Sequence, residues 1–230
     1  MNTLHYIFDP LCGWCYAAAP LISAARKLPG LAIAFHGGGM LTGSRRQTIT
    51  PQWRDYVMPH DRRIAQMTGQ PFGEAYFEGL LRDTSAVMDS APPTTAILAA
   101  EDIAGRGLDM IQALQHAHYA DGRRIADRPV LDAIAAELGL DVAGFAAAFD
   151  RLAGEPTERH FRESIGWLGR AGGQGFPTLL LEDASGRFSR IDIGRFLGQP
   201  EAFAAALREQ LPASDDEVMP HCGLDGCTDH

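Results

Sequence analysis

The chain has 230 residues, of which 46% are hydrophobic and 21% charged, which suits one folded domain with an insertion or two small domains. Its net charge of −9 argues against a nucleic-acid-binding surface, which needs a basic face. No apolar run approaches the roughly 20 residues that span a bilayer, and the first residues lack the basic and apolar regions of a signal peptide. We therefore expect a cytoplasmic protein without membrane or nucleic-acid partners.

The N-terminal residues predict a strand, a helix and a second strand. Residues 3–9 mix β-branched, aromatic and aliphatic side chains and stop at Pro10, which is typical of a buried strand. Apolar residues then recur at helical spacing from Cys12 onward, and residues 31–40 predict a short strand that runs into a glycine loop. Such a unit requires a right-handed crossover and indicates a parallel pair of strands.

The middle of the chain, from about residue 50 to residue 170, is predicted to be helical. Its segments are rich in alanine and leucine, open on Asp or Pro and close on Gly. No strand-like alternation interrupts them. The predicted helices cover residues 51–69, 92–107, 108–122, 128–140, 141–154 and 155–172.

Strand character returns at residues 175–183 and 188–194, and residues 201–211 predict an amphipathic terminal helix. This order predicts an α/β protein with a thioredoxin-like fold and an inserted α-helical domain. The expected limits are 1–45 with 170–211 for the thioredoxin-like domain, 46–169 for the helical insertion and 212–230 for a flexible C-terminal tail.

Cys12 and Cys15 stand where the first strand meets the first helix. The unpaired N–H groups and the dipole of a first helical turn stabilise a thiolate at Cys12. Cys15 lies one turn later on the same face and can resolve a mixed disulfide formed at Cys12. A Cys-x-x-Cys sequence can also be half of a zinc site or two inert thiols, but its place in a strand–helix–strand unit favours a redox pair. Trp14 can shield the sulfur atoms and offer an apolar surface to a substrate.

Pro177 gives a second indication, because it begins a strand although proline is normally excluded from central strands. An X-Pro bond at such a place is a candidate for the cis form. Beside the cysteine turn it would leave the Phe176 backbone free to pair with an extended substrate, and it would keep a metal from using the two thiols. A plain proline at the start of a strand is the simpler interpretation from sequence alone.

Together these features resemble the DsbA-like branch of the thioredoxin superfamily, and within it the cytoplasmic FrnE-type proteins and related disulfide isomerases. The matching segments are FDPLCGWCYAAAP, HGGGML, SAPPTTAILAAE, IADRPVLDAIAAELGLD and GQGFPTLLLED. The resemblance implies a redox pair at Cys12 and Cys15, a cis-proline at Pro177 and substrate contacts at neighbouring residues, namely Trp14, Phe176 and Thr178. It implies a thiol–disulfide oxidoreductase without a cofactor, which exchanges with protein, peptide or small-molecule thiols such as glutathione.

The chain departs from periplasmic DsbA in two respects, which are the lack of a signal peptide and the residues between the cysteines. DsbA carries a histidine there, which helps to make it a strong oxidant, whereas this chain carries Gly13 and Trp14. We therefore expect a weaker oxidant of the disulfide reductase or isomerase type. Kappa-class glutathione transferases and 2-hydroxychromene-2-carboxylate isomerases share the inserted helical domain and form the alternative, although they usually carry a serine at the active turn.

A second pair of cysteines, Cys222 and Cys227, lies near the C-terminus with His221 and His230 beside it. FrnE-type proteins resemble the chain in carrying such a Cys-x4-Cys pair, which can take part in redox exchange. The same four side chains suit zinc, and the tail cysteines can also be inert. A zinc-binding regulatory module that uses both cysteine pairs is a further alternative function. We expect no metal at the Cys12–Cys15 pair.

Two further predictions concern the surroundings of the cysteine turn. Asp9 precedes the turn and is a candidate to tune its thiols. The first inserted helix carries four large side chains that can line a groove above the turn, although core packing is the simpler interpretation. They are Trp53, Tyr56, Met58 and Met67.

Overall fold

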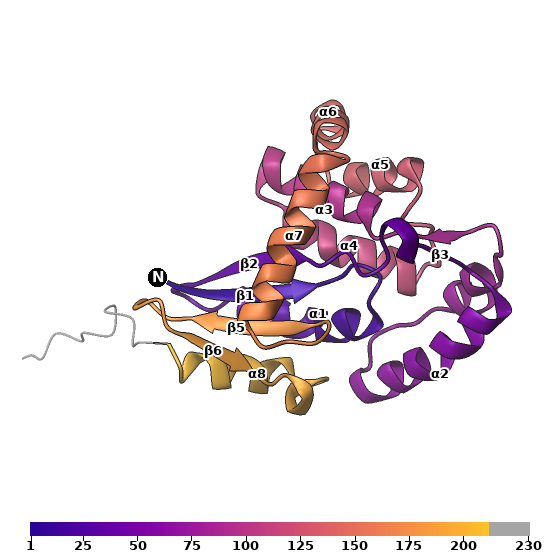
Figure 1. Ribbon diagram of the computed structural model, residues 1–230. Coiled ribbons are helices and arrows are strands. Elements are labelled where there is room, and N and C mark those ends of the chain that lie inside the picture. The colour runs from indigo at the N-terminus through magenta and orange to yellow at the C-terminus, as the bar shows by residue number, and fades with distance from the viewer. Residues whose placement is uncertain (212–230) are drawn as a thin grey trace, which may run out of the picture.

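The computed structural model describes residues 1–211, which form a four-stranded sheet flanked by helices (Figure 1). The strand order is β2-β1-β5-β6. Strand β1 (Asn2–Phe8) pairs in parallel with β2 (Leu31–Gly37) and antiparallel with β5 (Thr178–Glu182), as the predicted strand–helix–strand unit requires. Strand β6 (Phe188–Ile191) adds to β5 in antiparallel register and forms one edge of the sheet.

The two faces of the sheet carry different helices because successive side chains of β1 point to opposite sides. Tyr6 is buried on the face of α1 (Gly13–Ala25), and its hydroxyl donates a hydrogen bond of 3.2 Å to a backbone carbonyl of that helix. Helix α8 (Pro200–Arg208) packs beside α1. His5 points to the other face and stacks on an indole ring of α7 (Glu155–Arg170), with the ring centroids 3.9 Å apart.

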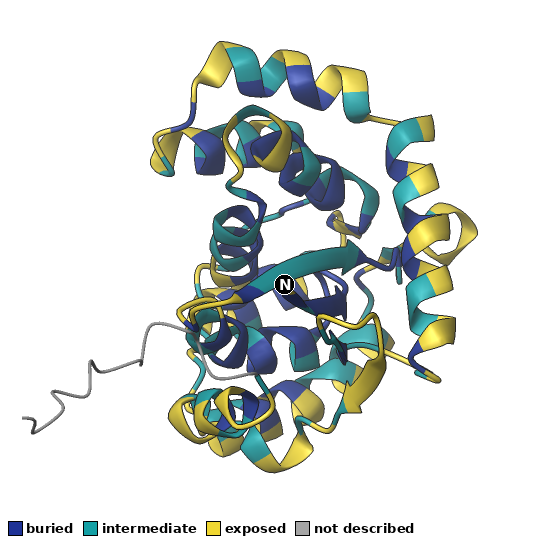
Figure 2. Ribbon diagram, turned by 90° about the vertical axis from the view of Figure 1, so that its left-hand side faces the viewer, coloured by how far each residue is buried: buried dark blue, intermediate teal, exposed yellow. Residues whose placement is uncertain are grey.

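The predicted helical insertion is present between β2 and β5. Helix α3 packs against α4 and α6, while α2 contacts α1 and lies beyond the carboxyl end of β1 (Figure 1). The inner faces of these helices are buried and their outer faces are exposed (Figure 2). The elements are α2 (Pro51–Thr68), α3 (Ala91–Ala104), α4 (Gly107–Tyr119), α5 (Arg128–Glu137) and α6 (Val142–Leu152).

The region also contains a short pair of strands that was not predicted. Strands β3 (Gln47–Thr48) and β4 (Val87–Met88) form a small antiparallel ladder. Each has two residues, which is too short to show an alternating pattern. The domain limits stay a prediction. The proposed boundary at residue 169 falls at the C-terminal end of α7, which contacts both α6 and β2.

Helix α2 is fixed at both ends by its sequence. The hydroxyl of Thr50 accepts a hydrogen bond of 3.1 Å from the backbone N–H of Trp53, and Pro51 occupies the first helical position. Gly69 ends the helix with a φ of 70°, which favours glycine. In residues 1–211, the structure contains no helix with the length and apolar character needed to cross a membrane.

Candidate active site

Cys12 caps the N-terminus of α1 with its own side chain. Its Sγ accepts a hydrogen bond from the backbone N–H of Cys15 at 3.3 Å and donates one to the carbonyl oxygen of Phe176 at 3.6 Å. The residue is 7% exposed. Because the N-terminal turn of a helix stabilises negative charge, this position suits a nucleophilic sulfur.

Cys15 lies one helical turn deeper and is fully buried. Both cysteines are free thiols in this structure. Burial raises the pKa of the Cys15 thiol well above its ordinary value, and the neighbouring Cys12 raises it further. Cys15 therefore stays protonated at neutral pH, which suits a thiol that reacts after Cys12 rather than before it.

The peptide bond between Phe176 and Pro177 is cis. The ring of Phe176 lies against Gly38, where an added Cβ atom would approach the ring to 2.1 Å. The N–H of Gly38 also donates a hydrogen bond of 2.7 Å to the carbonyl of Phe8, at the end of β1. The glycine loop after β2 thus leaves room for the ring of Phe176 beside the cysteine turn.

Only some of the residues expected to contact the substrate line a cavity at Cys12. Trp14 and Phe176 line a cavity in front of Cys12. In the described part of the chain, neither Pro177 nor Thr178 lines that cavity. Thr178 is buried, and its hydroxyl donates a hydrogen bond of 2.8 Å to the carbonyl of Gly175. Its position therefore favours a role in holding the loop before β5.

The tail predictions concern residues that the structure does not describe. Cys222, Cys227, His221 and His230 all lie beyond residue 211. Within residues 1–211, no group of three or more His, Cys, Asp or Glu side chains could hold a metal ion.

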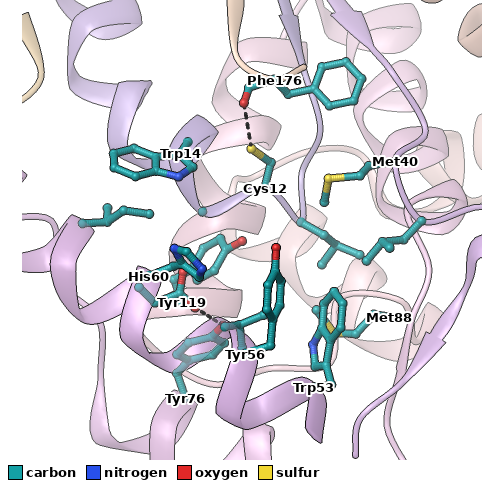
Figure 3. A pocket seen from close by; sticks show the side chains of 16 residues that line it. Cys12, Trp14, Met40, Trp53, Tyr56, His60, Tyr76, Met88, Tyr119 and Phe176 are labelled. Carbon is teal, nitrogen blue, oxygen red and sulfur yellow. Dashed lines mark hydrogen bonds between the residues drawn. The ribbon is translucent and has the colours of Figure 1, made fainter. Parts of the chain in front are cut away.

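The cavity in front of Cys12 has a volume of about 450 Å³. Helix α2 supplies the wall opposite the cysteine, with Trp53, Tyr56 and His60 facing it (Figure 3). Trp53 and Tyr56 thus line the groove considered from sequence, where core packing had been the simpler interpretation. Met58 and Met67 are not among the lining residues of the described chain. Aromatic and aliphatic side chains make up most of the wall, so the cavity suits an apolar group next to the Cys12 sulfur.

The wall also contains a buried acid that was not predicted, Asp61 of α2. The residue is 5% exposed, and its Oδ2 accepts a hydrogen bond of 2.7 Å from the hydroxyl of Tyr76. Burial raises the pKa of Asp61 to about 6, which the bond from Tyr76 partly opposes. The residue stands in the charged run His-Asp-Arg-Arg, which is typical of a solvated helix face, so no sequence signal marked it.

Asp9 is a second buried acid, and it connects three parts of the chain. Its carboxylate accepts hydrogen bonds from the N–H of Leu11 at 2.9 Å, the N–H of Met40 at 2.7 Å and the hydroxyl of Ser90 at 2.9 Å. Burial raises its pKa to about 6, against the effect of these donors. Asp9 thus ties the cysteine turn to the glycine loop and to the start of α3.

The DSBA-like thioredoxin domain family matches residues 3–193. The chain belongs to this family. The cytosolic disulfide reductase DsbM from Pseudomonas aeruginosa is 57% identical and has a TM-score of 0.85, with 90% of this chain and 98% of that chain covered. A structure described as the same reductase with GSH is 55% identical, with the same coverage and a TM-score of 0.84.

A structure of 2-hydroxychromene-2-carboxylate isomerase is 16% identical with a TM-score of 0.55, and it covers 90% of this chain and 97% of its own. That likeness shows a shared fold only. No curated protein matches the chain. The family and its reductase members identify the chain as a thiol–disulfide oxidoreductase.

Proposed function

We propose that this protein is a cytoplasmic disulfide reductase that works through Cys12 and Cys15 and takes its electrons from glutathione. The observation that carries the proposal is the Cys12 sulfur, which caps α1 at the wall of a cavity, one turn from the buried thiol of Cys15. The 57% identical relative is described as a cytosolic disulfide reductase, and the 55% identical structure is described as holding GSH. The first description supports the cytoplasmic compartment, and the second supports glutathione as the thiol partner.

The reaction proceeds by two exchanges at Cys12. Its thiolate attacks one sulfur of the substrate disulfide, so that a mixed disulfide forms and the other substrate sulfur leaves as a thiolate, which takes a proton from solvent. Cys15 then loses its proton and attacks the Cys12 sulfur, which releases the second substrate thiol and leaves a Cys12–Cys15 disulfide. Two glutathione molecules reduce that disulfide in the same two steps, giving one molecule of glutathione disulfide and restoring both thiols.

The substrates are disulfides of proteins, peptides or small thiols. Trp14 and Phe176 offer apolar contacts on either side of Cys12 (Figure 3). The Phe176 carbonyl accepts a hydrogen bond from the Cys12 sulfur, and an extended substrate backbone can pair with this segment. Thr178 contributes by its bond to Gly175, which fixes the loop.

The test is reduction of a peptide disulfide by glutathione, with glutathione reductase and NADPH reporting the glutathione disulfide formed. Cys12→Ser is expected to abolish the protein-dependent rate, because the attacking sulfur is lost. Cys15→Ser is expected to accumulate a mixed disulfide at Cys12, visible as an added substrate mass under non-reducing conditions. Activity that survives in Cys12→Ser would overturn the proposal.

A further inference from the structure

Asp61 occupies the space in which a side chain at position 13 would lie. A Cβ atom added to Gly13 would come within 2.6 Å of Asp61 Oδ1. Gly13 directly follows Cys12 and begins α1, so the carboxylate lies against the same helical turn that carries the reactive sulfur. The contact joins α2 of the helical insertion to the redox motif.

Stability does not explain the position of this carboxylate. Within residues 1–211, Tyr76 is its hydrogen-bond partner and no ion pair involves it. A buried carboxylate with one donor and no cation costs free energy, because it has lost its water without full compensation. An acid kept at such a place beside a reactive group indicates a functional role.

The groups around Asp61 leave its negative charge unbalanced. The titratable side chains that line the same cavity are Cys12 from α1, Tyr56 and His60 from α2, Tyr76 from the π-helical turn Ala75–Gly79 and Tyr119 from α4. No lysine or arginine of the described residues lines it. Because the pKa of Asp61 is about 6, the carboxyl is mostly ionised at neutral pH.

We propose that Asp61 acts through Cys12 to make the Cys12–Cys15 pair a better electron donor. A negative charge beside the reduced pair disfavours a thiolate at Cys12, whereas the disulfide carries no charge to repel. Stabilising the reduced form makes a thiol pair a strong oxidant, so destabilising it has the opposite effect. In the cycle, two electrons and two protons leave the dithiol for the substrate disulfide, and Asp61 favours that direction. The inference rests on the proposed function.

The experiment is a redox titration against glutathione and its disulfide, with the trapped thiols counted by mass. The full-length parent carries serine at Cys222 and Cys227, so that any intramolecular disulfide belongs to Cys12 and Cys15. The quantity measured is the ratio [GSH]²/[GSSG] at which half of the Cys12–Cys15 pair is oxidised. We expect this ratio to be about tenfold lower for Asp61→Asn than for the parent. That corresponds to a reduction potential about 30 mV more oxidising. The difference shrinks at about pH 5.5, where Asp61 of the parent is mostly protonated.

A matched control is Asp55→Asn, which removes a carboxylate from the exposed side of α2 and is expected to leave the ratio unchanged. Equal ratios in Asp61→Asn and the parent would overturn the role of Asp61 while leaving the proposed function intact. A parent that forms no intramolecular disulfide would instead overturn the proposed function. Should Asp61→Asn fail to fold, Tyr76→Phe replaces it, because loss of its donor favours the protonated acid. A ratio equal to that of the parent at pH 7 would then overturn the inference.

Discussion

Replacing Asp61 with asparagine should stabilise the protein above pH 6, although it removes a carboxylate from the wall of the cavity in front of Cys12. The native pKa of Asp61 is about 6 against an ordinary value of 3.8, so the native state holds this proton longer than the unfolded state does. The contribution of Asp61 to the free energy of unfolding is therefore fully present below pH 3.8, and it is lost as the pH rises to about 6. A difference of about two pKa units corresponds to about 3 kcal/mol at most, and about 2 kcal/mol of it falls between pH 4.5 and pH 8.

Urea unfolding of the wild type and Asp61→Asn at about pH 4.5 and about pH 8 measures this effect, since asparagine keeps the shape and the acceptor for Tyr76. The free-energy difference in favour of the variant should grow by about 2 kcal/mol between the two pH values. Asp55→Asn, an exposed acid on the same helix, should show no such growth. A difference that is the same at both pH values would refute the reasoning, because it would mean that burial does not oppose ionisation of Asp61.

Two further substitutions test neighbouring contacts. Asp9→Asn should lower the free energy of unfolding by about 2 kcal/mol at neutral pH, because both oxygens of Asp9 accept hydrogen bonds and an amide nitrogen would face a buried N–H. Urea denaturation checks this, and a gain in stability like that expected for Asp61→Asn would contradict it. Gly38→Ala should cost about 1–3 kcal/mol and slow disulfide reduction, because its methyl group would displace the ring of Phe176. An unchanged unfolding midpoint together with an unchanged rate would show that the ring moves aside freely.

The fold could be predicted where the pattern was local. Residues 3–9 show the composition of a buried strand, and residues 51–69 carry a proline near the start and a glycine at the end of a helix, so both elements were predicted to within one or two residues. Strands β3 and β4 were missed because a two-residue strand has no period. The parallel pairing of β1 and β2 followed from the handedness of a strand–helix–strand connection, which the sequence order alone decides.

The site could be predicted only in part. The Cys12–Cys15 motif marks itself by its spacing, but the opposite wall depends on how α2 packs over α1. Trp53 and Tyr56 could be assigned to a helix from the sequence, yet which way they faced could not. Asp61 looked like any acid on a polar helix face, and its contacts with Gly13 and Tyr76 form only when α2 packs against other elements.

The contact between Gly13 and Asp61 links two positions that would otherwise be expected to evolve independently. Here Asp61 takes the space beside position 13, so a side chain gained at position 13 in a descendant must displace the carboxylate. The two positions are expected to change together, and a redox motif transplanted without its distant partner should not keep its original chemistry.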